Sequence, residues 1–233
     1  MTTHTQTPTL YGYDDLARLM SLMTGDAKHD SSATSTLDVL WVLYDRVLSI
    51  DRDRVDDPGR DRFVLSKGHG PAAYYAVLAA KGFLPVDALS TFGHWDSSLG
   101  HHPDRVLLPG VELSSGSLGH GLPTSVGVAL GLRAQGLGAR TYCLVGDAEL
   151  DEGSNAEAIA AASRFGLGGL TAVVVDNASA SLGWPGGIGP RFTVEGWGSV
   201  DVDGRDHEQI EAGLLAGEPD RPHVVVAHVE DKA

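Results

Sequence analysis

The stretch that decides the fold is Leu144-Val-Gly-Asp-Ala-Glu-Leu-Asp-Glu-Gly153, together with a second apolar run that ends Val175-Asp176-Asn177. Both runs have the continuous apolar character of strands that are buried on two faces. The first run delivers Asp147 to its tip, and the second delivers Asn177. A carboxylate and a carboxamide at adjacent strand ends are hard oxygen ligands, which suit an octahedral Mg2+ that also binds phosphate oxygens. The sequence therefore predicts a metal-diphosphate site at one edge of a sheet.

The rest of the chain predicts an α/β fold with a doubly wound, mostly parallel sheet and helices on both faces, because buried strands alternate with helices. The expected strands are Thr141–Val145, Thr171–Val175 and Val224–Val229. The expected helices are Tyr13–Met23, Ser35–Leu48, Pro71–Lys81, Pro85–Phe92, Gly121–Gln135, Ser154–Phe165 and His207–Leu215. Ligands of such sheets bind at the carboxyl ends of the strands, where Asp147 and Asn177 fall. Residues 93–117 form a long loop, and loops of this length are usually functional.

Composition indicates one globular domain over residues 1–233, with residues 1–12 as a flexible tail. The chain is 42% hydrophobic and 21% charged, which is ordinary for such a domain. Its net charge of −14 argues against nucleic acid or an anionic membrane as a partner. The single cysteine, Cys143, cannot form an intramolecular disulfide, which favours a reducing cytoplasm. No segment has the length and apolarity of a membrane span.

Four motifs resemble those of transketolases, in the order and spacing of that family. They are Arg62-Phe-Val-Leu-Ser-Lys-Gly-His69, Gly116-Ser-Leu-Gly-His-Gly121, Gly146-Asp-Ala-Glu-Leu-Asp-Glu-Gly153 and Asp176-Asn177. The resemblance runs from about Asp14 to Val229 and is narrower still to the amino-terminal, diphosphate-binding half of a split transketolase. It implies the thiamine diphosphate-binding fold, with thiamine diphosphate and Mg2+ as cofactors.

The resemblance also implies roles for individual residues. Asp147 and Asn177 match the magnesium ligands, and a backbone carbonyl at Ser179 matches the third protein ligand. The residues implied in cofactor binding are Gly116, Leu118, Gly146, Asp147, Ala148, Asn177 and His69. The implied catalytic histidines are His69 near the reacting centre, His102 before Pro103, and His29. Glu152 matches a glutamate in a network across the interface between subunits.

Plainer interpretations stand beside several of these roles. Asp147 taken alone is as readily a helix cap as a ligand, and the pairing with Asn177 favours the metal site. His101 and His102 are alternatives, and the neighbouring proline favours His102. Lys67 either neutralises phosphate or pairs with a carboxylate. His120 stands where transketolases usually have glutamine, and it either begins a helix or takes part in catalysis.

Several stretches depart from the family pattern. The usual Gly-Asp-Gly is Gly146-Asp147-Ala148 here, which adds a methyl group where the backbone approaches the diphosphate. The usual Gly-His-Pro-Gly is Lys28-His29-Asp30-Ser31, so Asp30 adds negative charge near a site for anions. The stretch Ala178–Gly187 is rewritten, and the sequence ends before the segment in which the family places a further histidine.

We therefore expect one chain of a transketolase-type enzyme that transfers a two-carbon ketol unit and works with a separate, carboxy-terminal, pyrimidine-binding subunit, with two copies of each chain. The donor is a ketose phosphate or an α-keto acid, and the departures suggest a carrier protein or lipoyl arm as acceptor. One alternative is the decarboxylating component of an α-keto acid dehydrogenase, which shares the metal motif. The other is a degenerate regulatory homologue without cofactor, which Ala148 and Asp30 keep open.

Overall fold

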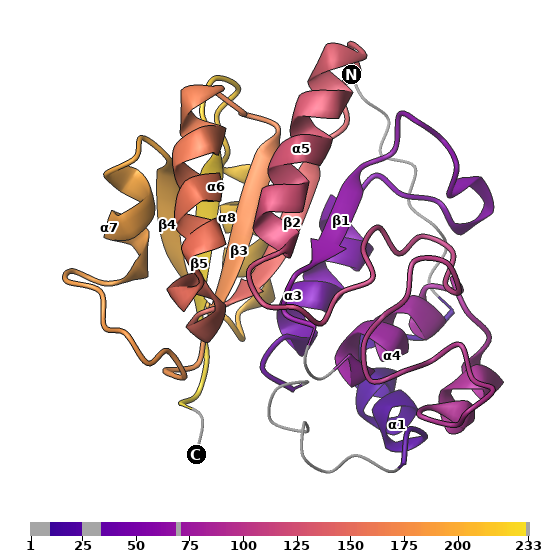
Figure 1. Ribbon diagram of the computed structural model, residues 1–233. Helices are drawn as coiled ribbons and strands as arrows, with labels where there is room; N and C mark the ends of the chain where they lie inside the picture. Colours follow the sequence, from indigo (N-terminus) through magenta and orange to yellow (C-terminus); the bar gives the residue numbers. More distant parts are fainter. Residues whose placement is uncertain (1–9, 25–33, 69–70, 232–233) are drawn as a thin grey trace.

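The computed structural model describes residues 10–24, 34–68 and 71–231, which fold around a five-stranded sheet (Figure 1). The strands are β1 (Arg62–Leu65), β2 (Thr141–Gly146), β3 (Leu170–Asp176), β4 (Gly198–Asp203) and β5 (His223–His228). Their spatial order is β1-β2-β3-β5-β4, and every neighbouring pair is parallel. The expected parallel α/β fold is confirmed.

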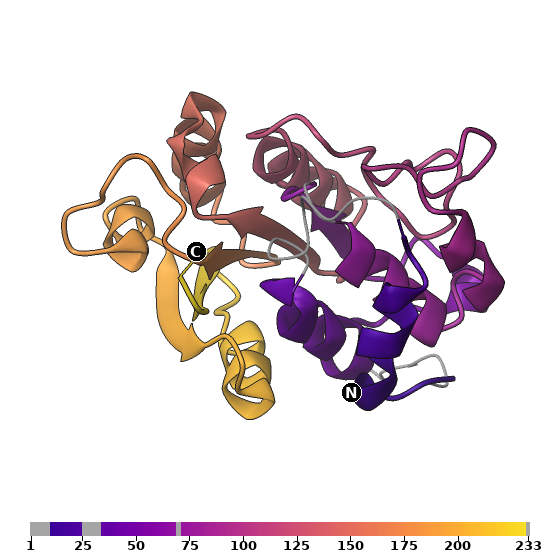
Figure 2. The ribbon, with the colours of Figure 1, turned by 90° about the horizontal axis from the view of Figure 1, so that it is seen from below.

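The central strands separate two apolar cores, because successive side chains of a strand point to opposite faces. Tyr142 and Leu144 belong to one core, and Cys143 and Val145 belong to the other. The first core is covered by α1 (Leu16–Ser21), α3 (Leu37–Val42), α4 (Ala72–Ala80) and α8 (His207–Leu215). The second is covered by α5 (Gly121–Ala134), α6 (Gly153–Arg164) and α7 (Ile188–Thr193), and Figure 2 shows the sheet between these layers. Among the described helices, none is long and apolar enough to cross a membrane.

The sequence analysis did not predict two strands, β1 and β4, or helix α7, because none of them has a long apolar or periodic run. Strand β1 has only four residues, so its apolar run, Phe63–Leu65, is short. Edge strand β4 has just Val202 fully buried and therefore no continuous apolar run. Helix α7 has six residues and follows a glycine-rich loop. The helix expected at Ser35–Leu48 is α3 followed by a π-helical turn, η3 (Leu43–Val47). The remaining short helical turns are η1 (Tyr13–Asp15), η4 (Arg52–Arg54), η5 (Val86–Thr91) and η6 (Ala148–Asp151).

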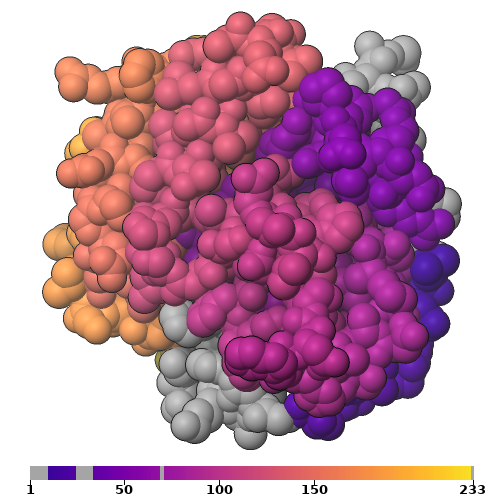
Figure 3. Space-filling model, turned by 45° about the vertical axis from the view of Figure 1, so that its right-hand side comes forward, coloured from indigo at the N-terminus to yellow at the C-terminus, as the bar shows by residue number. Residues whose placement is uncertain are grey.

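The long loop expected after residue 92 is present, and it leads from η5 to α5 without a helix or strand. It is fastened to the core by the Tyr75 hydroxyl, which donates to the Gly100 carbonyl at 2.9 Å. It is also closed on itself by the Gly93 N–H, which donates to the Leu99 carbonyl at 2.8 Å. Figure 3 shows this segment, in magenta, over the middle of one face of the molecule. The loop is therefore an ordered part of the surface that ends in the glycine turn before α5.

Asp61→Ala should destabilise the fold by about 2 kcal/mol, because it leaves two backbone donors without their acceptor. The buried Asp61 carboxylate accepts the Ser49 N–H at 2.9 Å and the Arg140 N–H at 2.8 Å, which joins the starts of β1 and β2. Urea denaturation measures the change in free energy of unfolding. The exposed Asp56→Ala is the matched control and should change it by less than about 0.5 kcal/mol. Equal losses in both variants would contradict this account.

Candidate functional site

The two predicted metal ligands meet at the carboxyl edge of the sheet. Asp147 directly follows β2, and Asn177 directly follows β3, which is the neighbouring strand. The Asp147 N–H extends the pairing by donating to the Val175 carbonyl at 3.1 Å. Both side chains are buried, with Asp147 1% and Asn177 4% exposed. The strand pairing therefore brings a carboxylate and a carboxamide together in a site largely closed to water.

Ser179 reaches the same carboxylate by a sharp turn of the chain. Ala178 has a φ of +53°, a left-handed conformation that is uncommon for a residue with a side chain. The turn lets the Ser179 N–H donate to Asp147 Oδ2 and the Ser179 hydroxyl donate to Asp147 Oδ1, both at 2.6 Å. The Ala180 N–H adds a third bond to Oδ2 at 3.0 Å. The third residue of the predicted metal set is thus in contact with the first.

Asn177 has a buried oxygen atom that is available to a ligand. Its Oδ1 is buried and has no hydrogen-bond partner, an arrangement that costs free energy in a folded protein. A divalent cation bound by carboxylate, carboxamide and main-chain oxygens would satisfy this atom, and such a set fits Mg2+. In the described part of the chain, no cluster of three or more His, Cys, Asp or Glu residues could hold a metal by itself. A cation here would depend on carboxamide, main-chain and phosphate oxygens as well.

The glycine turn before α5 lies beside His102. Gly116 has a φ of +136°, and a Cβ added there would lie 2.9 Å from Cδ2 of the His102 ring. His101 instead packs edge-on against Phe92, with ring centroids 5.3 Å apart. Leu118 is 37% exposed on the same turn. Of the two alternative histidines, His102 is the one that lies against a predicted cofactor-binding residue.

Lys67 brings a positive charge to the predicted diphosphate edge. It follows the end of β1, and its Nζ donates to the Ser35 hydroxyl at 2.7 Å. A Cβ added at Gly146 would lie 3.3 Å from Cδ of Lys67, so the lysine stem covers the residue before Asp147. This position is compatible with the phosphate-neutralising role that the sequence left open.

The structure does not test the predicted roles of the remaining residues. His29 and His69 lie outside the described residues, so their catalytic roles stay predictions. Ala148 is the first residue of η6 and is half-buried. His120 is the residue before α5 and accepts the Thr124 N–H and hydroxyl at its carbonyl. Glu152 is the residue before α6, so its predicted role at a subunit interface stays a prediction.

Glu149 is a site residue that the sequence analysis missed. It is 1% exposed, and burial raises the pKa of its carboxyl group, against hydrogen bonds from Ser66, Gly119 and Gly146 that favour the charged form. The one feature of the sequence that points to Glu149 is its place two residues after Asp147 and next to the apolar Leu150, which is buried in the structure. Nothing in the sequence indicates which donors would surround it.

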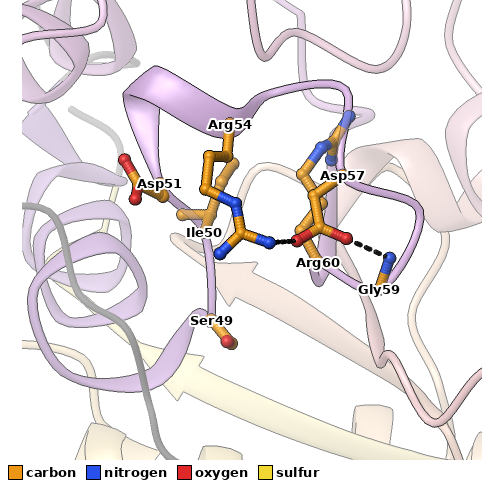
Figure 4. Close-up of a pocket in the computed structure, with 7 residues that line it drawn as sticks. All are labelled: Ser49, Ile50, Asp51, Arg54, Asp57, Gly59 and Arg60. Atoms are coloured by element: carbon orange, nitrogen blue, oxygen red, sulfur yellow. Dashed lines mark hydrogen bonds and ion pairs between the residues drawn. The ribbon is translucent and has the colours of Figure 1, made fainter.

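One pocket lies at the carboxyl edge of the sheet, and another lies away from it. A pocket of about 320 Å3 opens beside Asp147, between the loop after Asn177 and the ends of β3, β4 and β5. A smaller pocket of about 110 Å3 lies in the loop before β1 and is shown in Figure 4. Its Arg54 pairs with Asp57, and its Arg60 pairs with Glu112. Both arginines already pair with carboxylates, so the smaller pocket offers little positive charge to an anionic ligand. The pocket beside Asp147 is therefore the better candidate for the functional site.

The fold is a parallel α/β domain with a buried carboxylate and a buried carboxamide at its carboxyl edge. Comparison with known proteins agrees: the model of the transketolase, thiamine diphosphate-binding domain family matches residues 18–229. A protein of Actinobacillus succinogenes, named as one of the subunits of an apulose-4-phosphate transketolase, is 37% identical over 207 residues. That match covers 86% of this chain and 75% of the other. The chain belongs to the transketolase family, and it resembles members that are named as individual transketolase subunits.

Two further comparisons extend this result. A protein of Rhodococcoides fascians named ferredoxin fas2 is 56% identical over 225 residues, which cover 96% of this chain and 74% of that protein. This sequence has one cysteine, whereas the iron–sulfur clusters of ferredoxins take four cysteine ligands. A transketolase from Pichia stipitis in complex with sedoheptulose-7-phosphate superposes with a TM-score of 0.75 at 27% identity. That match covers 86% of this chain and 36% of the other.

Asn177→Ala should weaken metal binding while leaving the metal-free fold nearly unchanged, because the lost oxygen has no hydrogen bond to lose. We expect the affinity for Mn2+, with thiamine diphosphate present, to fall about tenfold or more, equal to about 1.4 kcal/mol. Electron paramagnetic resonance titration of Mn2+ measures this change. The free energy of unfolding without metal should change by less than about 1 kcal/mol.

Asn155→Ala is the matched control at a second buried asparagine. Its Nδ2 donates to the Glu149 carbonyl at 2.6 Å, so its loss should destabilise the fold more than the loss of Asn177. Unchanged Mn2+ affinity in Asn177→Ala would show that the unpartnered oxygen is not a ligand.

Proposed function

We propose that this chain is the diphosphate-binding subunit of a thiamine diphosphate- and Mg2+-dependent transketolase-type enzyme, which transfers a two-carbon ketol unit. The observation that carries the proposal is the unpartnered, buried Asn177 Oδ1 beside the Asp147 carboxylate at adjacent strand ends. Membership of the transketolase family supports the same cofactor. Ser179 contributes the third protein ligand through its backbone carbonyl.

Thiamine diphosphate, when bound, supplies the nucleophile and electron sink for cleavage of a ketose carbon–carbon bond. The chain's own residues bind, orient and exclude water. Asp147 and Asn177 hold the metal, and the Gly116–Leu118 main chain contacts the cofactor. Burial of the two ligands strengthens the electrostatic attraction between the site and the diphosphate-bound cation. His102 binds a substrate hydroxyl from the loop face, and the proposed catalytic work of His29 and His69 is proton transfer.

The donor we propose is a ketose phosphate. The relative from Actinobacillus succinogenes is named for apulose-4-phosphate, which supports a phosphorylated sugar as the substrate class. Because the net charge of the chain is −14, such an anion needs local positive charge, and Lys67 beside Gly146 supplies some of it. An α-keto acid is the alternative donor and would make the chain resemble a dehydrogenase component.

The active site is completed, in this proposal, by a carboxy-terminal chain that contributes the pyrimidine-binding half, with two copies of each chain. Several relatives are named as individual subunits of transketolases, which supports a separate partner. The acceptor is a carrier protein or lipoyl arm, since the sequence around His29 departs from the family pattern. The buried free thiol of Cys143 supports a cytoplasmic location.

Asp147→Ala should abolish cofactor-dependent turnover in the two-subunit complex, because the metal loses its only charged ligand in the proposed set. We expect kcat/KM for ketol transfer from a ketose phosphate to fall by about a hundredfold or more. Product formation by mass spectrometry measures it, with an aldose phosphate, a lipoylated carrier domain and a ferredoxin as separate acceptors. Transfer to the aldose phosphate alone would reject the carrier and keep the enzyme.

Asp220→Ala is the control, since Asp220 is exposed before β5 at the opposite edge of the sheet. It should keep wild-type turnover. Native mass spectrometry of the complex tests the partner, and two copies of each chain with bound cofactor is the expected result. A wild-type chain that takes up no thiamine diphosphate, with or without a partner, would leave only the regulatory homologue.

A further inference from the structure

Glu149 lies in η6, two residues after the proposed metal ligand Asp147, and its carboxylate is surrounded by hydrogen-bond donors. Oε1 accepts the Ser66 hydroxyl and the Gly119 N–H, the latter at 2.8 Å. Oε2 accepts the Gly146 N–H in a longer bond of 3.4 Å. These donors come from the end of β1, from the glycine turn before α5 and from the end of β2. One buried carboxylate therefore joins three of the four motifs that identify the family.

The contact extends to a second amide of the glycine turn. The Gly121 N–H donates to the Ser66 hydroxyl oxygen at 3.0 Å. Since a serine hydroxyl has one proton to donate, its donation to Glu149 leaves its lone pairs free for Gly121. The amides of Gly119 and Gly121 thus both depend on Glu149, one directly and one through Ser66.

The backbone of the turn is enclosed on its other sides. A Cβ added at Gly68 would lie 2.7 Å from the Gly116 nitrogen, and one added at Gly119 would lie 2.5 Å from Ser154 Oγ. The Ser154 hydroxyl also donates to the Gly119 carbonyl at 2.7 Å, so both polar groups of that peptide are used. A turn packed this closely moves as one piece, and its place is set by the groups that bind its amides.

We propose that Glu149 is a positioning residue, which holds the Gly116–Leu118 main chain in the position that contacts thiamine diphosphate. This inference rests on the proposed function. A carboxylate only accepts hydrogen bonds, so it can receive the Ser66, Gly119 and Gly146 donors together. A glutamine has the same shape but presents an NH2 group to at least one of these donors. With its oxygen toward Ser66 and Gly119, its NH2 group would face the Gly146 N–H and push the side chain, with the turn it holds, away from the end of β2. With its oxygen toward Gly146, the NH2 group would repel the Gly119 N–H and release the turn.

The test compares Glu149→Gln with wild type by calorimetric titration of thiamine diphosphate into the two-subunit complex, and of Mn2+ alone. We expect the Kd for thiamine diphosphate to rise at least about tenfold, while the Kd for Mn2+ changes less than about threefold. In turnover, KM for the cofactor should rise more than kcat falls. The exposed Glu195→Gln is the charge-matched control and should bind both as wild type does.

A double-mutant cycle with Ser66→Ala tests the pathway from Glu149 to the turn. Both substitutions break the same connection, so the double variant should lose less cofactor affinity than the product of the two single losses. Ser66→Ala also serves if Glu149→Gln fails to fold. Cofactor affinity within twofold of wild type in both variants would overturn the proposal, and so would equal losses of Mn2+ and cofactor binding. Wild type that binds Mn2+ but no thiamine diphosphate would reject the proposed function itself.

Discussion

The pairing of β2 with β3 is the constraint on which the site depends. Gly146 and Val175 are register partners, and the Asp147 N–H continues the ladder to the Val175 carbonyl. Parallel strands end at the same edge of a sheet, so the residues that follow them are neighbours in space. Because both strands are buried in two apolar cores, a slip in register would move every side chain to the wrong face. The hydrophobic cores therefore fix where Asp147 and Asn177, the two proposed ligands, lie.

Around this rigid edge, the remaining parts of the site are loops held by polar contacts. The Ala178–Ala180 turn is held by the Asp147 carboxylate, and the turn before α5 is held by Glu149 and Ser154. A neighbouring carboxylate, Asp151, accepts the N–H groups of Ser181 and Leu182. Acidic residues of one motif thus order two loops at the edge of the sheet where the proposed metal site lies.

The chain resembles only part of a complete transketolase, and the fold shows what that part supplies. It covers 36% of the Pichia stipitis transketolase chain but 75% of the relative from Actinobacillus succinogenes. The described domain carries Asp147 and Asn177, both buried, at the carboxyl edge of its sheet. Leu118, on the glycine turn before α5, is exposed.

The sequence alone determined the α/β class, the family and the pair Asp147 and Asn177, because these follow from apolar runs and from the residues that end them. It missed β4, whose polar residues face solvent at the edge of the sheet, and it offered no reason to choose Glu149. Only the tertiary structure placed His102 against Gly116 and gathered Ser66, Gly119 and Gly146 around one carboxylate. Periodicity records which face of an element is buried, whereas hydrogen bonds between loops depend on how distant segments pack. Local apolar runs therefore predict the strands of the sheet, whereas the hydrogen-bond partners of a buried carboxylate come from distant segments and cannot be predicted in this way.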